Sequence, residues 1–291
     1  MQCISNGSSP QTVSFCKFPS SSLVLNYFND PEKDIDLAYC KELGIRVCRV
    51  MASGGPVFGD TGYIFTFLHL RRENPKVPPH AAAMFEKTLS GIAQKISSVF
   101  RVESRYRPLN DLEVRCNDGK WRKVGPSSCF YDDKAIQMGS GLQVKKPDVD
   151  LMARVIPTPP EKWIDKEAKT VQERVTYLEE ITKSTIDLDC VKTAYKEAIE
   201  EIFEVRLEVG EMSPLETQVY AQMEERYTND QFFMERSEKV KLGLPPLGVT
   251  RRSIQFKVPG GPFMRIVLFV HDGVILDALI TGGIHASPSF S

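Results

Sequence analysis

The sequence predicts an α+β fold, in which strands follow one another directly and helices stand between groups of strands. Short runs typical of strands come in succession at 12–17, 23–28 and 45–50. Apolar residues between 85 and 99 recur at the spacing of one helical face. The chain then returns to three strand-like runs between 253 and 281. This order differs from the regular strand–helix alternation of a parallel α/β sheet.

The first half is expected to alternate short strands with three helices. Gly44 marks the C-terminal end of the first helix, and the turn Asn117-Asp118-Gly119 predicts a hairpin between the strands on either side of it. Pro157 follows the last helix of this half and ends it. The expected strands cover 12–17, 23–28, 45–50, 63–70, 112–116, 120–124 and 135–144, and the expected helices cover 34–43, 85–99 and 148–155.

The second half begins with helices. Apolar residues between 188 and 205 recur at the spacing of one helical face, so a helix is expected there. Ser213-Pro214-Leu215-Glu216 is a capping box with proline at the first helical position, so a further helix is expected to run from there to Tyr227. The proline- and glycine-rich segment 243–248 reads as a linker before the strands at 253–258, 263–270 and 274–281.

Composition excludes several classes of protein. There are 37 basic and 38 acidic residues, so the net charge of −1 gives no reason to expect nucleic-acid or membrane binding. No apolar run is long enough for a transmembrane helix, and residues 1–10 lack a secretory signal pattern. None of the seven cysteines forms a C-x-x-C pair, and the four histidines lack metal-ligand spacing. We therefore expect no metal site and a cytoplasmic location.

A glycine-rich loop between two strand-like runs is the first candidate site. Gly54 and Gly55 would let the backbone approach a ligand where a Cβ would collide. Successive N–H groups in such a loop can form a nest that binds anions such as phosphate. Asp60, just beyond, could orient a donor or a metal. The alternative interpretation is a plain tight turn.

The second candidate is Lys123, which is expected at the end of a short strand and before a turn of small residues at 125–128. An ammonium there could neutralise a carboxylate and a phosphate as they react. The alternative is a solvated surface lysine. A third motif, Lys257 to Pro262, has glycine pairs that could equally only shape the corner of a hairpin.

Taken in order, these motifs resemble the biotin/lipoate protein ligase superfamily and, within it, the lipoate–protein ligases. The family pattern of Arg-Arg, two variable residues, Gly-Gly-Gly, an apolar stretch and His-Asp is similar to Arg49–Asp60. The Asn-Asp pair of the family is matched by Asn110-Asp111, and its Lys-Ile/Val-Ser-Gly-Ser-Ala motif is similar to 123–128. A later Lys-Ser-Val-x-x-Arg-Val-Thr-x-Leu stretch, helical in the family, is similar to 169–178.

The accessory-domain signature of the family is similar to 257–262 and 280–284. The resemblance implies a central mixed β-sheet flanked by helices, which is the biotin/lipoate ligase fold, with a small C-terminal α+β domain. On this basis residues 1–245 are expected to form the catalytic domain and 246–291 a shortened accessory domain.

The resemblance also implies a reaction in two steps. The carboxylate of lipoate attacks the α-phosphate of ATP with Mg²⁺, which gives lipoyl-adenylate and pyrophosphate. A lysine of a lipoyl carrier domain then attacks the mixed anhydride; the carrier would resemble the glycine-cleavage H-protein or the E2 of a 2-oxoacid dehydrogenase. ATP, Mg²⁺ and lipoate would be substrates and not tightly bound cofactors. Octanoate in place of lipoate, and a separate accessory subunit, stay open.

By this resemblance Lys123 is the catalytic residue, in contact with the lipoyl carboxyl and the α-phosphate. The interpretation requires Lys123 to face Gly54 and Gly55 across one cleft. Val57, Phe58 and Phe65 are candidates for an apolar tunnel around the lipoyl tail. Further contacts to ATP or lipoyl-adenylate are implied for Arg49, Ser53, Gly54, Gly55, Pro56, Val57, Phe58, Asp60, Asn110, Asp111 and Ser127.

The sequence departs from the family pattern at several positions. Val50 takes the place of the second arginine, Gly59 that of the histidine, and Gly283 that of an aspartate in the accessory signature. These replacements keep open a homologue that binds lipoate or a carrier without catalysis. A third interpretation is an ATP-independent octanoyl or lipoyl transferase with Cys129 as nucleophile, against which Cys129 could simply be a small buried residue.

Overall fold

The structure, a computed structural model, describes residues 1–159, 170–259 and 261–284. Three parts of the expected motifs therefore lie outside the described residues: Lys169, Gly260 and 285–291. The chain divides into two compact units that are interleaved in sequence, and each is described by itself. The first unit comprises 1–20, 59–148 and 170–221, and the second comprises 21–58, 149–169 and 222–291. The expected domain boundary between residues 245 and 246 stays a prediction.

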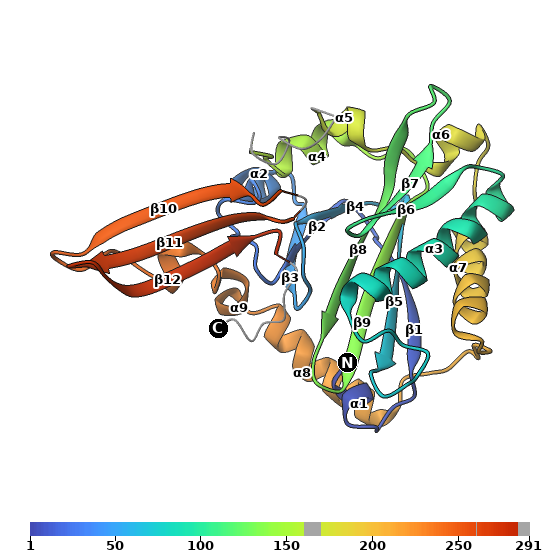
Figure 1. The fold of residues 1–291 in the computed structure, drawn as a ribbon, viewed down its shortest axis with the longest axis horizontal. Coiled ribbons are helices and arrows are strands. Elements are labelled where there is room, and N and C mark those ends of the chain that lie inside the picture. The colour runs from blue at the N-terminus through green and yellow to red at the C-terminus, as the bar shows by residue number, and fades with distance from the viewer. Residues whose placement is uncertain (160–169, 260, 285–291) are drawn as a thin grey trace. The chain divides into compact units, whose positions relative to one another are not determined.

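The first unit is built on a six-stranded sheet in the order β1-β5-β9-β8-β7-β6 (Figure 1). All its neighbouring strands pair antiparallel. Its strands are β1 (Thr12–Lys17), β5 (Tyr63–Arg71), β6 (Ser104–Arg107), β7 (Asp111–Arg115), β8 (Trp121–Tyr131) and β9 (Ala135–Gln143). Its helices are α1 (Gln2–Ser5), α3 (Ala81–Phe100), α5 (Val171–Arg174), α6 (Leu178–Thr182) and α7 (Leu188–Phe203).

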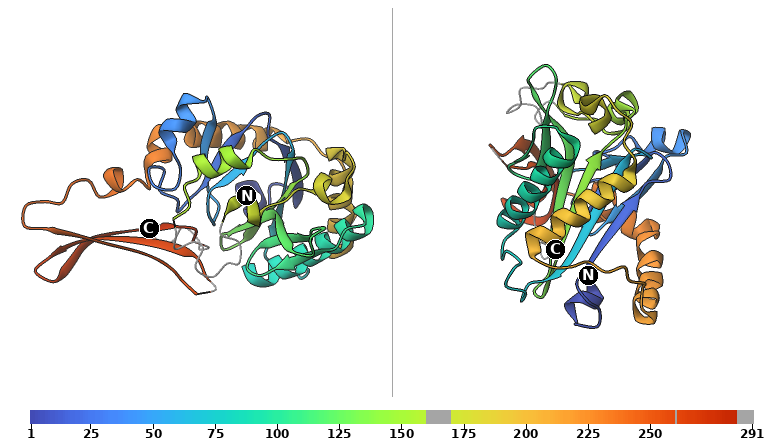
Figure 2. Two further views of the ribbon diagram at one scale, coloured as in Figure 1. Left: turned by 90° about the horizontal axis from the view of Figure 1, so that it is seen from above. Right: turned by 90° about the vertical axis from the view of Figure 1, so that its right-hand side faces the viewer.

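Helices α3 and α7 lie side by side against one face of this sheet, as the right-hand view of Figure 2 shows. Both helices are amphipathic, and their apolar faces supply Leu89, Ile92 and Tyr195 to the core. The strands contribute the alternate residues that face these helices, such as Leu68 and Met138, which are fully buried. Burial of this continuous apolar layer stabilises the first unit.

The second unit contains two three-stranded sheets. In the sheet of order β3-β2-β4, strands β2 and β3 pair in parallel. The other sheet has the order β10-β11-β12 and is antiparallel. The strands are β2 (Ser22–Asn26), β3 (Arg46–Val50), β4 (Val57–Gly59), β10 (Thr250–Lys257), β11 (Phe263–His271) and β12 (Val274–Gly282). The helices are α2 (Leu37–Glu42), α4 (Val149–Val155), α9 (Asp230–Met234) and α10 (Glu238–Lys241), and α8 (Pro214–Tyr227) spans the division between the units.

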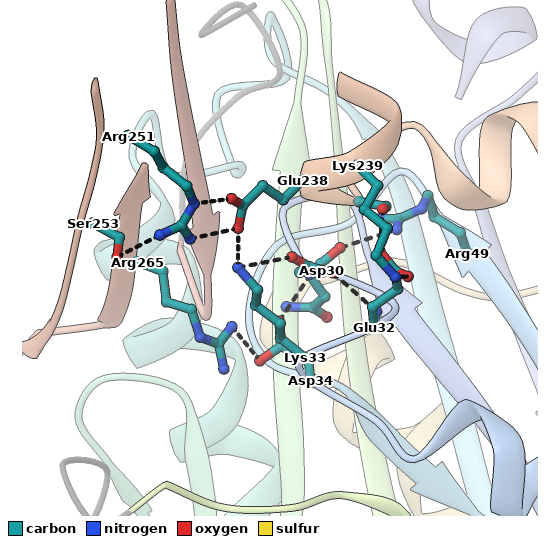
Figure 3. Close-up of polar contacts among 12 residues, drawn as sticks. Asp30, Glu32, Lys33, Asp34, Arg49, Glu238, Lys239, Arg251, Ser253 and Arg265 are labelled. Atoms are coloured by element: carbon teal, nitrogen blue, oxygen red, sulfur yellow. Dashed lines mark hydrogen bonds and ion pairs between the residues drawn. The ribbon is translucent and has the colours of Figure 1, made fainter. Parts of the chain in front are cut away.

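Charged side chains connect the C-terminal sheet to the loop after β2 and to α10 (Figure 3). Arg265 of β11 and Asp34 form a buried ion pair at 2.9 Å. Glu238 of α10 accepts hydrogen bonds from Lys33 and Arg251, the latter from Nη2 at 3.0 Å. Such a network contributes more to stability than isolated surface ion pairs do, because its members share partners.

The predicted α+β fold class is confirmed, and the parallel pairing of the expected mixed sheet lies in the small β3-β2-β4 sheet. The capping box is present: the backbone N–H of Glu216 donates to Ser213 Oγ at 3.2 Å, and the N–H of Ser213 donates to the Glu216 carboxylate at 2.7 Å. One prediction about the hairpin was wrong. The small residues 125–128 continue β8 and form no turn, because they pair with β7 and β9.

Candidate active site

The predicted site residues fall in both units. Asp60, Asn110, Asp111, Lys123 and Ser127 belong to the first unit, and Arg49 together with 53–58 belongs to the second. The two groups are therefore described separately. The expectation that Lys123 faces the glycine loop stays a prediction.

Lys123 lies within β8 and forms an ion pair with Asp111 at the start of β7. Its Nζ is 2.5 Å from Asp111 Oδ1. Arg174 binds the other oxygen of the same carboxylate, with Nη2 2.9 Å from Oδ2. The Asp111 side chain is 11% exposed and that of Lys123 is 22% exposed, so both charges are largely withdrawn from water. Two cations thus share one carboxylate in a partly buried site.

The pKa of Lys123 is lowered from its usual value. Burial is the main cause, because it disfavours the charged form. The neighbouring Asp111 carboxylate opposes this shift, and the positive charge of Arg174 adds to it. An ammonium of this kind attracts an incoming anion more strongly than a solvated lysine does, because little water screens it.

Asn110 and Ser127 bind each other across the strands. The N–H of Ser127 donates to the carbonyl of Asn110 at 2.9 Å, and Asn110 Nδ2 donates to the carbonyl of Ser127. Ser127 pairs with Ser140, so the two side chains lie on the same face of the sheet, and Ser140 lies within 3.5 Å of Tyr195 on the core side. The Ser127 side chain therefore lies on the face of the sheet that α7 covers, and its predicted contact with the adenylate stays a prediction.

Asp60 closes the turn between β4 and β5. Its Oδ1 accepts the N–H of Gly62 at 2.8 Å and the side-chain amide of Gln143 at 3.1 Å. Among the described residues, no group of three or more His, Cys, Asp or Glu side chains could hold a metal ion. The contacts of Asp60 are those of a turn-forming carboxylate.

The glycine loop of the second unit is held by two asparagines. Asn29 donates from its amide to the carbonyls of Gly54 and Gly282, both at 3.0 Å, and Asn26 donates to the carbonyl of Gly55 at 2.7 Å. The N–H of Gly54 donates to the carbonyl of Ile284 at 2.9 Å. The predicted nest is therefore incomplete in this conformation, because one of its N–H groups already has an acceptor.

The two glycines of the loop differ in what the fold requires of them. Gly54 has φ +107°, which a residue with a Cβ rarely adopts. Gly55 has no positive φ, and a Cβ added there would meet no atom within 4 Å. The fold alone does not explain why residue 55 is a glycine. Its small size is what a closely approaching ligand would require.

The residues after Gly55 lead into β4. Pro56 and Val57 are half-buried, and Ser53 before the glycines is buried. The ring of Phe58 packs in a hydrophobic cluster of the second unit with Leu23, Leu25, Ile35, Cys40 and Val155. Phe65 lies in the first unit, where it stacks on Phe67 at a centroid distance of 5.3 Å. The proposed tunnel wall is thus not supported for the Phe58 ring, which belongs to a core.

Arg49 is fully buried and binds backbone carbonyls. Its Nε donates to Phe233 at 2.9 Å, Nη1 to Tyr27 at 2.7 Å and to Asn26 at 3.2 Å, and Nη2 to Asn29 at 3.0 Å. Burial lowers the pKa of Arg49 to about 10, so it stays charged at neutral pH. The guanidinium thus shapes the loop at 26–29, and the predicted contact with ATP or lipoyl-adenylate stays a prediction.

The Cys129 thiol is buried in the core of the first unit, on the same strand as Lys123. Burial raises its pKa to about 12, so the thiolate that a nucleophile requires is strongly disfavoured. This environment supports the interpretation of Cys129 as a small buried residue.

Two residues were not predicted, one in each of the two groups. No motif in the sequence indicated Asn29, because its hydrogen bond to the carbonyl of Gly282 joins residues that are far apart in the sequence. Arg174 lies in the 169–178 stretch that the sequence singled out as helical, but a role for its side chain was not inferred. Within 170–178, helix α5 ends at Arg174 and Leu178 begins α6, and between them Val175 forms a parallel bridge with Lys123.

Comparison with known proteins places the chain in a family. A family model described as the lipoyl protein ligase A/B catalytic domain matches residues 1–200. Lipoate-protein ligase A subunit 1 of Thermoplasma acidophilum is 26% identical over 170 residues, which cover 57% of this chain and 63% of that protein, less than two thirds of its length. Octanoyltransferase LipM of Clostridioides difficile is 21% identical over 246 residues, which cover 79% of this chain and 89% of that protein.

Solved structures share the fold. A bipartite lipoate protein ligase from Thermoplasma acidophilum, studied with its E2 lipoyl domain, has a TM-score of 0.68 at 20% identity, covering 80% of this chain and 88% of that one. Lipoate-protein ligase A bound with ATP has a TM-score of 0.65 at 18% identity, covering 80% of this chain and 90% of that one.

Within 1–159, 170–259 and 261–284, no helix has the length and apolar character needed to cross a membrane. The family model spans more than half of the chain, and the order of the motifs agrees with it. The chain therefore belongs to the lipoyl protein ligase A/B catalytic domain family.

Proposed function

We propose that this protein is a lipoate–protein ligase that activates lipoate with ATP and transfers it to a lysine of a carrier domain. The observation that carries the proposal is the Lys123 ammonium, which pairs with Asp111 beside Arg174 in a partly buried site, where burial lowers its pKa. Membership of the family supports the acyl substrate. The solved ligase bound with ATP shares the fold and supports the nucleotide.

The chemistry explains why a buried ammonium is needed. A free carboxylate does not acylate an amine at neutral pH, so it must first gain a good leaving group. In the first step the carboxylate oxygen bonds to the α-phosphorus of ATP, and the bond to the pyrophosphate oxygen breaks. Two negatively charged groups must approach each other for this to happen. Lys123 would neutralise charge on both and hold them in contact.

In the second step the carrier lysine attacks the acyl carbon of the adenylate. The bond from that carbon to the AMP oxygen breaks, and the amine loses a proton as the amide forms. Lys123 would stabilise the negative charge that moves onto AMP. A relative that was studied with its E2 lipoyl domain supports a carrier of this kind, and its bipartite nature supports a separate accessory subunit as a further partner.

ATP would enter as its magnesium complex, with the metal as part of the substrate. The glycine loop would approach the nucleotide at Gly55, where a Cβ would meet open space. Arg49 would act indirectly by fixing the backbone around Asn26 and Asn29, whose amides hold the loop carbonyls. The cytoplasmic location stays a prediction.

An acyl transferase without ATP is the second candidate, favoured by the likeness to octanoyltransferase LipM over 79% of the chain. The core position and high pKa of Cys129 speak against that thiol as the nucleophile. A homologue that binds without catalysis is favoured by Val50 and Gly59, which replace an arginine and a histidine of the family pattern.

Exchange of labelled pyrophosphate into ATP tests the proposal, because only an adenylate-forming enzyme reverses the first step. A ligase shows exchange that depends on lipoate. A transferase instead accepts octanoyl carrier without ATP and forms a thioester visible by mass spectrometry. Binding of lipoate or carrier in calorimetry without either reaction identifies the non-catalytic homologue.

A further inference from the structure

Two cations bind opposite oxygens of one carboxylate in the first unit. Lys123 Nζ lies 2.5 Å from Asp111 Oδ1, and Arg174 Nη2 lies 2.9 Å from Asp111 Oδ2. The Asp111 side chain is 11% exposed. A carboxylate with so little access to water depends on its protein partners for stabilisation of its charge.

This arrangement sets a problem for the proposed reaction. Lys123 must bring its ammonium to the oxygens of an acyl carboxylate and a phosphate, but in this structure it is bound to Asp111. If Lys123 left, Asp111 would lose a charged partner in a site with little access to water, and removal of one partner from a buried pair is strongly unfavourable. A second cation that remains on the carboxylate lowers this cost.

We propose that Arg174 is a positioning residue that keeps Asp111 paired, so that the Lys123 ammonium can pass from Asp111 to the anionic substrate. This inference rests on the proposed function. The planar guanidinium of Arg174 is always charged and its shape fits a carboxylate. Arg174 can therefore bind Asp111 without competing for the reacting atoms.

The backbone fixes Arg174 relative to Lys123. The N–H of Thr176 donates to the carbonyl of Lys123 at 2.9 Å, and Val175 forms a parallel bridge with Lys123. Nε of Arg122 donates to the carbonyl of Glu173 at 3.2 Å. The segment that carries Arg174 is thus hydrogen-bonded to β8 at Lys123, the residue that Arg174 is proposed to position.

The test is a double-mutant cycle of Arg174→Gln and Asp111→Asn, read by lipoate-dependent pyrophosphate exchange. In Arg174→Gln, Asp111 retains Lys123, so kcat for exchange should fall about tenfold or more. In the Asp111→Asn background there is no carboxylate to retain Lys123, and Arg174→Gln should cause no further loss. Arg174→Lys should recover part of the rate. Arg115→Gln is the matched control, because it removes another arginine–carboxylate pair of the same unit, Arg115 with Glu103.

The pH profile gives a readout that a merely structural role would not move. Loss of the Arg174 charge raises the pKa of Lys123, so the fall of the exchange rate at high pH should move to higher pH. Loss of the Asp111 charge lowers the pKa of Lys123, so the same fall should move to lower pH. The proposal would be overturned if Arg174→Gln lowered the exchange rate equally in wild type and in Asp111→Asn and did not change the pH dependence of that rate.

A measurement without catalysis separates failure of this inference from failure of the proposed function. The pH dependence of Lys123 acylation by acetic anhydride, followed by mass spectrometry, reports its pKa directly. Arg174→Gln should make Lys123 less reactive at a given pH below its pKa, and Asp111→Asn should make it more reactive. If wild type lacks exchange but the two variants change Lys123 reactivity as expected, the electrostatic coupling of Arg174 and Asp111 to Lys123 stands and the ligase assignment fails. Unchanged reactivity in both variants would refute the coupling itself.

Discussion

The side-chain amide of Asn29 donates a hydrogen bond to the carbonyl oxygen of Gly54 at 3.0 Å. Its second amide hydrogen binds the carbonyl of Gly282, also at 3.0 Å, and its oxygen accepts the N–H of Asn26 at 2.8 Å. Asn29 is fully buried. One side chain therefore joins the glycine loop to the end of β12, and the N–H of Gly54 extends the connection to Ile284.

Replacement of Asn29 by alanine should destabilise the protein. Two buried carbonyls and one N–H lose their partner, which should lower the free energy of unfolding by roughly 2–4 kcal/mol. Urea unfolding measures this loss, and hydrogen exchange at the Gly54 amide should become faster. Asn117→Ala, in an exposed turn, is the control and should change stability by less than about 0.5 kcal/mol. Equal stability of both variants would contradict this role of Asn29.

Replacement of Gly55 by alanine separates ligand binding from folding. A Cβ at residue 55 meets no atom within 4 Å, so stability should change by less than about 0.5 kcal/mol. If a nucleotide approaches this backbone, the methyl group should raise the KM for ATP about tenfold. Steady-state exchange kinetics check this. Gly210→Ala is the matched control, since that glycine also faces open space. An unchanged KM for ATP would show that the loop is only a turn.

Local patterns in the sequence predicted much of the fold. The apolar face at 85–99 predicted α3, and the capping box at 213–216 predicted the start of α8. Both patterns could be recognised because each depends on residues that are close together in the sequence. The sequence pattern missed the short elements α1, β4, β6, α6, α9 and α10, which tertiary contacts stabilise more than their own sequences do. The turn expected at 125–128 failed because small residues are equally suited to a strand crowded by its neighbours: a Cβ at Gly125 would lie 1.9 Å from the carbonyl oxygen of Gly141.

The candidate site was predicted less completely. The motifs named Lys123 and Asp111, and the structure brings these two together. Arg49 and Ser127 were also named, but residue type alone does not give the direction of a side chain: one guanidinium binds backbone carbonyls and one hydroxyl faces the core. Asn29 could not be found from spacing, because its partners lie 25 and 253 residues away.

Replacement of Cys129 by alanine should leave the ligase reaction almost intact. The thiol lies in the core with a pKa of about 12, so its loss should cost only about 1 kcal/mol of stability through poorer packing. The rate of exchange should stay within about twofold of wild type. Loss of all activity, together with an acyl thioester on the wild-type protein in mass spectra, would instead support the transferase.

Glu238 should make stability depend on pH. The ion pair with Arg251, and further that with Lys33, hold the pKa of Glu238 at about 2, below its usual 4.5. The unfolded chain therefore binds a proton first as the pH falls, so the stabilisation is complete above about 4.5 and is lost as the pH falls through about 2. Because its side chain is 16% exposed, we expect Glu238→Gln to lower the free energy of unfolding at pH 7 by about 2 kcal/mol.

Urea unfolding of wild type and Glu238→Gln between pH 7 and pH 2.5 measures this contribution. The difference between the two proteins should narrow as the pH falls below about 4.5. Glu225→Gln, on the exposed helix α8, should differ little from wild type at either pH. A gap between wild type and Glu238→Gln that is the same at pH 7 and pH 2.5 would exclude the ion pairs as its origin.

The central claim is that the Lys123 ammonium promotes attack of lipoate on ATP. The most direct measurement is exchange of labelled pyrophosphate into ATP by the purified protein, with and without lipoate, for wild type and Lys123→Ala. We expect wild type to show exchange only with lipoate and Lys123→Ala to show none although it remains folded, which urea unfolding checks. No exchange by wild type at millimolar lipoate and MgATP, or full exchange by a folded Lys123→Ala, would contradict the claim.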